Sequence, residues 1–151
     1  MAKAGAEGSR KRTVKEREKY IMSLVNQMTL DEKIGMIHGA GLFRTAGVPR
    51  LGIPELHMSD GPMGVRQEFV DNDWKNVYDS DDTVTYLPSN SAIAATWNPK
   101  RAKECGEVLG AEARGRGKDV ILAPGINIKR TQLCGRNFEY MSEDPYLVSE
   151  M

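Results

Sequence analysis

The 151-residue sequence lacks the long apolar runs of secreted and membrane-spanning proteins. Residues 1–19 contain no stretch that could serve as the apolar region of a signal peptide. No part of the chain approaches the ~20 apolar residues that a membrane helix needs. These absences predict a cytoplasmic protein that makes no membrane contact.

Cysteine and histidine are also scarce. The two cysteines, Cys105 and Cys134, have no metal-site spacing, and His38 and His57 have no partners at such a spacing. Reduced thiols are the simplest interpretation, with Cys105 packed on a helix face. We therefore expect no metal site. We also expect no cofactor, because the glycines do not form the GxGxxG pattern of a dinucleotide site.

Charge of one sign is not in excess, since 21 Lys and Arg balance 21 Asp and Glu. This balance argues against nucleic acid or an anionic membrane as the main partner. Residues 1–20 lean basic, which leaves a nucleic-acid-binding arm as an alternative there. A tail that leads into a solvated helix face is favoured, because the charges are mixed in sign and no aromatic residue precedes Tyr20.

Two helices are predicted near the N-terminus. From Lys15 onward, apolar residues recur at helical intervals of three and four. They are Tyr20, Ile21, Leu24, Val25 and Met28. A capping box at residues 29–32 then begins a second short helix, with Ile34 and Ile37 facing inward and an end near Gly39. A loop is expected from there to Gly52.

Two short apolar segments, 56–59 and 119–124, have the pattern of buried strands. Each is followed by a long polar segment, 60–90 after the first and 125–144 after the second. Structureless loops of this length in a compact domain are usually either functional or disordered. These two loops are therefore the first places to look for a site.

Helices are predicted after both loops. Asn98-Pro99 has the pattern of an N-cap followed by the first helical residue, and glycines at 115 and 117 end that helix. Asp144-Pro145 begins a further helix in the same way. The Ala- and Ser-rich segment 87–97 fits either a short helix or a buried extended segment.

The resulting order is strand, loop, helix, strand, loop, helix, which predicts an α/β fold with parallel strands and a right-handed crossover. In (β/α)8 barrels and in open α/β sheets alike, ligands bind at the carboxyl ends of such strands. A barrel needs eight strands, usually in about 250 residues, and this chain supplies about two βα units preceded by N-terminal helices. We expect a disordered tail, 1–13, and one incomplete domain, 14–151.

Three residues in the two loops are candidates for binding a polar ligand. Asp60 ends the first predicted strand, and the Gly-Pro that follows it would turn the carboxylate toward the mouth of the sheet. There it could accept hydrogen bonds from two neighbouring hydroxyl groups, or simply cap the turn. Arg66 and Arg136 could each present a fork of donors to a carboxylate or to sugar oxygens, or brace their loops.

The remaining polar and aromatic candidates favour structural roles. Glu139, Glu143 and Asp144 could suggest a glycosidase acid/base pair, but carboxylates at a helix start have a sufficient structural reason there. We expect Asp144 to cap the helix, and Glu143 or Glu139 to bond loop amides or to pair with Arg136. His57 is expected to be a satisfied core histidine, and Trp97 to pack against the domain.

Most of the chain from about residue 29 resembles the start of the catalytic barrel of family 3 glycoside hydrolases, and the bacterial β-glucosidases among them. The matching stretches follow one another in family order. They are residues 27–34, 52–54, 59–66, 87–89, 95–99, 123–127 and 134–146. The Asp-Gly-Pro after the first strand resembles the β-glucosidase branch more than the hexosaminidase branch.

The resemblance implies a TIM (β/α)8 barrel and sugar-binding roles for the matching residues. Asp60 would accept hydrogen bonds from the hydroxyls at carbons 4 and 6 of the sugar, and Arg66 and Arg136 would line the same pocket. The family's aspartate nucleophile and its acid/base carboxylate come later in its sequence. Asp73-Trp74 is not identified as the nucleophile, because Asn72 precedes it and it lies in a polar loop only thirteen residues after Asp60.

We therefore expect the N-terminal fragment of a retaining β-glucosidase-type hydrolase that acts on terminal β-linked sugars. The chain carries part of the sugar pocket but no catalytic residue, so by itself it is expected to be inactive. A small-molecule or oligosaccharide β-glycoside and the remainder of the barrel are the expected partners. The alternative is a non-catalytic sugar-binding or interaction module that another chain completes.

Overall fold

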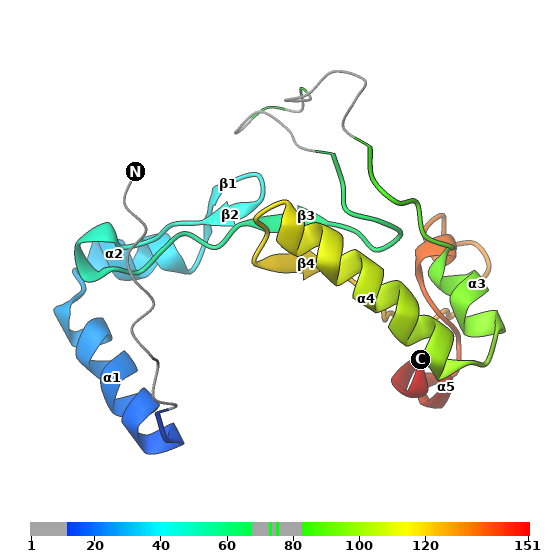
Figure 1. Cartoon of the computed structure of the whole chain (residues 1–151), viewed down its shortest axis with the longest axis horizontal. Helices are drawn as coiled ribbons and strands as arrows, with labels where there is room; N and C mark the ends of the chain where they lie inside the picture. Colours follow the sequence, from blue (N-terminus) through cyan, green and yellow to red (C-terminus); the bar gives the residue numbers. More distant parts are fainter. Residues whose placement is uncertain (1–11, 68–72, 74, 76–82) are drawn as a thin grey trace.

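The computed structural model describes residues 12–67, 73, 75 and 83–151. Two N-terminal helices lie at one end, a pair of strands with a long helix alongside lies in the middle, and two short helices lie at the other end (Figure 1). No helix within the described ranges is both long and apolar enough to cross a membrane. Most of the predicted tail and most of the segment 67–86 lie outside the described residues.

Local capping signals determine where the first two helices begin. Helix α1, Val14–Gln27, follows a capping box formed by Thr13 and Glu16. Helix α2, Leu30–Met36, follows the predicted box of Thr29 and Glu32. In each box the N-cap hydroxyl accepts a backbone N–H while the glutamate accepts the N-cap N–H.

The predicted inward positions of Ile34 and Ile37, in and just after α2, are wrong for the described chain. Neither helix contains a buried residue. Ile34 is exposed, and Ile37 is 84% exposed. The helical period was read correctly, but a periodic face is buried only when another segment packs on it.

An ion pair fastens α2 to the segment that follows. Arg50, in the 3-10 helix η1 at Pro49–Leu51, donates from Nε and Nη2 to the two carboxylate oxygens of Glu32, each at 2.6 Å. Nη2 also donates to the carbonyl of Gln27 at 2.7 Å. The Arg50 hydrogen bonds, and then the N–H of Thr29, lower the Glu32 pKa from 4.5 to about 2.

Replacing Arg50 with alanine is expected to return the Glu32 pKa toward its ordinary value. The pKa is depressed in the folded chain, so the pair stabilises the fold above about pH 4.5, and this contribution is lost as the pH falls toward 2. Carbon-13 NMR titration of the carboxyl group would measure the change. Arg101→Ala, which removes a pair with Glu104 on another helix, is the control and should leave Glu32 unchanged.

The segment between α2 and the first central strand contains a small hairpin where a loop was expected. Strand β1, Gly39–Gly41, pairs antiparallel with β2, Arg44–Thr45. Leu42 and Phe43 form the turn between them. The hairpin is tied to the next segment, because the N–H of Met58 donates to the carbonyl of Phe43 at 2.8 Å.

The predicted parallel pair of strands is confirmed. Strand β3, Met58–Asp60, pairs with β4, Val120–Leu122, and Asp60 lies opposite Leu122. The strands are shorter and less buried than expected, since both ends of β4 are exposed. His57 precedes β3 and its side chain is 48% exposed beside Glu55, so the expectation of a core histidine is wrong.

Two helices cross from β3 to β4. Segment 87–97 contains the short helix α3, Asn90–Ala95. Helix α4, Pro99–Gly115, begins at the predicted cap, where Asn98 accepts the N–H of Lys100 at 3.1 Å. Trp97 joins them with a φ of 52° and is 74% exposed, so its predicted packing role is wrong.

The small apolar core lies between α4 and the loop that follows β3. Its buried members are Val65, Leu87, Leu109 and Ala113. Cys105 packs against this cluster, as predicted from its place on the helix face. The core therefore holds the start of the first loop, which bears Asp60 and Arg66, against the crossover helix.

Candidate functional site

Asp60 lies where the first predicted loop begins, as the last residue of β3. It is half-buried, and its Oδ1 accepts the N–H of Gly61 at 3.1 Å. A cis peptide bond, Gly61-Pro62, follows, and β4 is followed by a second one, Ala123-Pro124. Because β3 and β4 run parallel, the two loops begin at the same edge of the sheet.

Arg66 lies at the other end of the turn that begins at Asp60. Its N–H donates to the carbonyl of Asp60 at 3.2 Å, which closes the turn. The guanidinium lies over the ring of Phe43, with Cζ 3.8 Å from the ring centre. Its Nε and Nη1 atoms are buried. The structure therefore holds both the backbone and the side chain of Arg66 close to the end of β3.

The turn is also held against the segment that precedes α3. The N–H of Leu87 donates to the carbonyl of Met63 at 2.8 Å. Gly64 has a φ of 139°, and a Cβ there would lie 2.5 Å from the carbonyl oxygen of Thr85. Only glycine allows this close approach of the two backbones, which explains the glycine in the sequence between Asp60 and Arg66.

Arg136 lies in the second loop and pairs with Glu139, through Nε and a carboxylate oxygen. Glu139 is the last residue of the 3-10 helix η2, Asn137–Glu139. The Arg136 side chain is 72% exposed while that of Glu139 is 13% exposed. The glutamate therefore anchors the arginine and leaves much of its guanidinium open to solvent.

Glu139 dominates the electrostatic environment of Arg136. The pKa of Arg136 is raised, first by the hydrogen bond from its Nε to Glu139, and then by the charges of Glu139 and Tyr140, with Asp60 as the smallest contribution. The Glu139 pair therefore stabilises the cation that the second loop presents.

Helix α3 holds the second loop in place, which sequence reasoning did not anticipate. The Ser91 hydroxyl lies 2.9 Å from the carbonyl of Tyr140 and donates to it, and Lys129 Nζ donates to the same hydroxyl at 2.6 Å. Asn90 Nδ2 donates to the carbonyl of Glu139 at 2.7 Å. The only sign of this role in the sequence was the pair of polar residues, Asn90 and Ser91, at the start of a short apolar helix.

A close backbone contact completes the second loop. Gly125 and Tyr140 form an isolated parallel bridge beside the sheet. A Cβ on Gly125 would lie 2.3 Å from the carbonyl oxygen of Glu139. The bridge therefore brings the segment with Arg136 back toward the end of β4.

The other carboxylates near the site have structural contacts. Asp144 caps helix α5, Pro145–Glu150, by accepting the N–H of Tyr146 at 2.9 Å, as predicted. Glu143 accepts the Ser142 hydroxyl at 3.4 Å. Asp73 lies 3.6 Å from Lys75, and its neighbour at position 74 lies outside the described residues. Within the described ranges, no group of three or more His, Cys, Asp and Glu could hold a metal.

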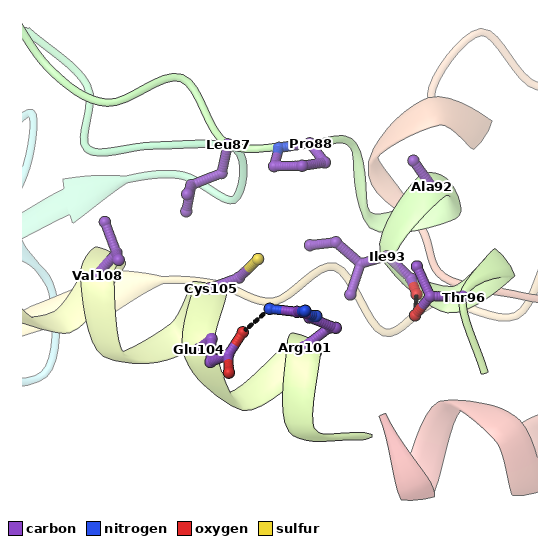
Figure 2. A pocket seen from close by; sticks show the side chains of 9 residues that line it. All are labelled: Leu87, Pro88, Ala92, Ile93, Thr96, Arg101, Glu104, Cys105 and Val108. Atoms are coloured by element: carbon purple, nitrogen blue, oxygen red, sulfur yellow. Dashed lines mark hydrogen bonds and ion pairs between the residues drawn. The ribbon is translucent and has the colours of Figure 1, made fainter. Parts of the chain in front are cut away.

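An apolar groove of about 420 Å³ lies between α3 and α4, away from these loops (Figure 2). Leu87 and Pro88 lie on one side of it, and Cys105 and Val108 lie on the α4 side. The Arg101–Glu104 ion pair lies at its rim. None of the three predicted binding residues lines this groove, so it is not part of their site.

Comparison with known proteins identifies consistent similarities. Residues 52–151 match the model of the glycosyl hydrolase family 3 N-terminal domain. The chain is 52% identical over 134 residues to a beta-glucosidase of Bacteroides ovatus, covering 89% of this chain and 18% of that protein. It is 43% identical over 131 residues to thermostable beta-glucosidase B of Acetivibrio thermocellus, covering 87% and 17% respectively.

A solved structure has a similar backbone. Beta-glucosidase 3B from Thermotoga neapolitana, in complex with alpha-D-glucose, aligns with a TM-score of 0.74 at 38% identity. The alignment covers 87% of this chain and 20% of that one. The chain thus spans less than a fifth of the length of the two curated relatives, at 18% and 17%.

Proposed function

The chain belongs to glycosyl hydrolase family 3, and on that premise we propose that it forms the N-terminal part of the catalytic barrel of a retaining β-glucosidase-type hydrolase. Strands β3 and β4 and the crossover helix α4 are then the first βα units of a (β/α)8 barrel. The substrate is a terminal β-linked sugar of the glucose type. The support for this class of ligand is that the Thermotoga relative holds glucose.

One observation carries the proposal: Asp60 and the loop that bears Arg136 follow neighbouring parallel strands at the same sheet edge, and the Gly125–Tyr140 bridge returns that loop toward the end of β4. In barrel enzymes this edge is where substrates bind. An ionised carboxylate accepts hydrogen bonds from two adjacent sugar hydroxyls, and a guanidinium donates to sugar oxygens. Asp60 then binds the hydroxyls at carbons 4 and 6, with Arg66 and Arg136 in the same pocket.

The chemical step needs groups outside residues 1–151. Retaining hydrolysis requires a carboxylate nucleophile, which forms a covalent glycosyl-enzyme, and a second carboxyl group that acts as acid and then as base. Among the described carboxylates, Glu139 is paired with Arg136 and Asp144 caps α5. The role of this chain is therefore to bind and orient the sugar.

A chimera tests the proposal most directly. In this chimera the chain replaces the matching 134 residues of the Bacteroides ovatus beta-glucosidase. We expect the chimera to hydrolyse an aryl β-glucoside, and the purified chain alone to show no measurable turnover. A folded but inactive chimera would contradict the proposal, and robust turnover by the chain alone would show that it has catalytic residues of its own.

The second candidate is a non-catalytic sugar-binding or interaction module that another chain completes. It is favoured by the exposed apolar side chains of Val120 and Leu122 and by the absence of any buried residue in α1. Such surfaces usually pack against something. Size-exclusion chromatography that finds a monodisperse chain, together with a cooperative melting transition, would count against this candidate.

A further inference from the structure

The contact between Phe43 and Arg66 joins the β1–β2 hairpin to the end of β3. Cζ of Arg66 lies 3.8 Å from the centre of the Phe43 ring, so the cation covers one face of the ring. Both side chains are half-buried. A cation over an aromatic face is attracted by the ring quadrupole, and the attraction grows as water is excluded. This contact therefore favours one plane for the guanidinium.

Backbone bonds fix the ring relative to Asp60. The carbonyl of Phe43 accepts the N–H of Met58 at 2.8 Å, two residues before Asp60. The N–H of Arg66 donates to the carbonyl of Asp60 at 3.2 Å. Arg44, next to Phe43, also forms an antiparallel bridge with His57. Backbone hydrogen bonds therefore join Phe43 to the start of β3 and Arg66 to its end.

Burial further restricts the orientation of this arginine. Nε and Nη1 of Arg66 are buried, and one face of the guanidinium lies on Phe43. The directions in which the guanidinium N–H groups point depend on the plane of the group, which the ring favours.

We propose that Phe43 is a positioning residue for sugar recognition, whose ring holds the plane of the Arg66 guanidinium beside Asp60. This inference rests on the proposed function, because it requires that the sugar lie against Arg66. It assigns to the β1–β2 hairpin a part in binding, although the hairpin precedes the residues that the family model matches. Phe43 itself needs no contact with the sugar.

NMR of the labelled 151-residue chain tests the contact, and calorimetry with D-glucose as the probe tests binding in the chimera described above, where the barrel is complete. In the unmodified chain we expect the Arg66 side-chain protons to show an upfield ring-current shift, and in the unmodified chimera we expect glucose to bind. Phe43→Leu should remove the ring-current shift and weaken glucose binding about tenfold, as expected for loss of a partly desolvated cation–π contact. Phe43→Tyr, which keeps the ring face, should restore both.

Leu42 provides the matched control, since it lies in the same hairpin turn and is exposed. Leu42→Ala should leave the ring-current shift and the glucose affinity unchanged. If the Phe43→Leu chimera binds glucose as well as the unmodified chimera while the Arg66→Lys chimera binds it poorly, the positioning role is wrong and the proposed function stands. If the folded, unmodified chimera does not bind glucose, the proposed function is overturned, and this inference with it.

Discussion

The Asp60→Ala substitution in the chimera is expected to lower kcat/KM for an aryl β-glucoside by roughly 10²- to 10⁴-fold. Hydrogen bonds to a charged group contribute about 1.5–3 kcal/mol each. Two hydroxyls bound by one carboxylate therefore account for about 3–6 kcal/mol, at about 1.4 kcal/mol for each tenfold change in rate. Steady-state kinetics measure the loss directly.

The local structure fixes the position of the Asp60 carboxylate. The residue ends β3 opposite Leu122, and the N–H of Gly61 holds one carboxylate oxygen in place. Asp60→Asn should keep the shape and lose the charge, so its activity should lie between those of the unmodified chimera and the alanine variant. Glu107→Gln removes a carboxylate from an exposed ion pair on α4 and is the control.

A small change in kcat/KM on Asp60→Ala would contradict the assignment of this residue to the sugar pocket. An activity within about threefold of the unmodified chimera corresponds to less than 1 kcal/mol, less than one charged hydrogen bond contributes. Thermal unfolding of each variant separates binding from folding. The assignment requires a melting temperature close to that of the unmodified chimera together with the kinetic loss.

Gly125→Ala is expected to destabilise the chain by about 1–3 kcal/mol, the usual cost of forcing extra atoms into a packed site. The new Cβ would lie 2.3 Å from the carbonyl oxygen of Glu139 and 3.1 Å from the Tyr140 ring. The nearest atom belongs to the backbone, so a simple side-chain rotation cannot relieve the clash. The bridge to Tyr140 must open, and the segment with Arg136 must move.

Gly110→Ala supplies the opposite expectation within the same chain. Gly110 lies inside α4, and a Cβ there meets nothing within 4 Å. Alanine in an open helical position stabilises by about 0.8–1 kcal/mol relative to glycine. Urea unfolding followed by circular dichroism should therefore move the midpoint up for this variant and down for Gly125→Ala. Equal midpoints would contradict the close approach at Gly125.

Predictions from the sequence succeeded where an interaction lies within a few residues of chain. The caps at Thr29, Asn98 and Asp144 are all present, because a cap joins a side chain to a backbone N–H two or three residues later. The parallel pairing of the two strands also follows from the order of the elements. These features need no knowledge of what lies across the molecule.

Predictions of which side chains are buried, and of which ion pairs they form, were wrong or incomplete more often. Ile37 has a helical apolar position, yet it is exposed, and His57 is solvent-facing where a core residue was expected. The sequence left open whether Glu143 or Glu139 pairs with Arg136, and the structure pairs Glu139 with it. In each case the outcome depends on which remote segment packs on the residue, and local pattern contains no such information.

By itself the sequence determined the family, the element order and the identity of Asp60, Arg66 and Arg136 as candidates, since each depends on residue type and spacing. Only the tertiary structure decided that Phe43 lies against Arg66 and that Ser91 holds the second loop. Strands β2 and β3 and the 3-10 helix η1 lie between Phe43 and Arg66 in the chain, and α4, β4 and η2 lie between Ser91 and Tyr140. Such contacts arise from chain crossings and close packing, which bring together residues that no local periodicity relates.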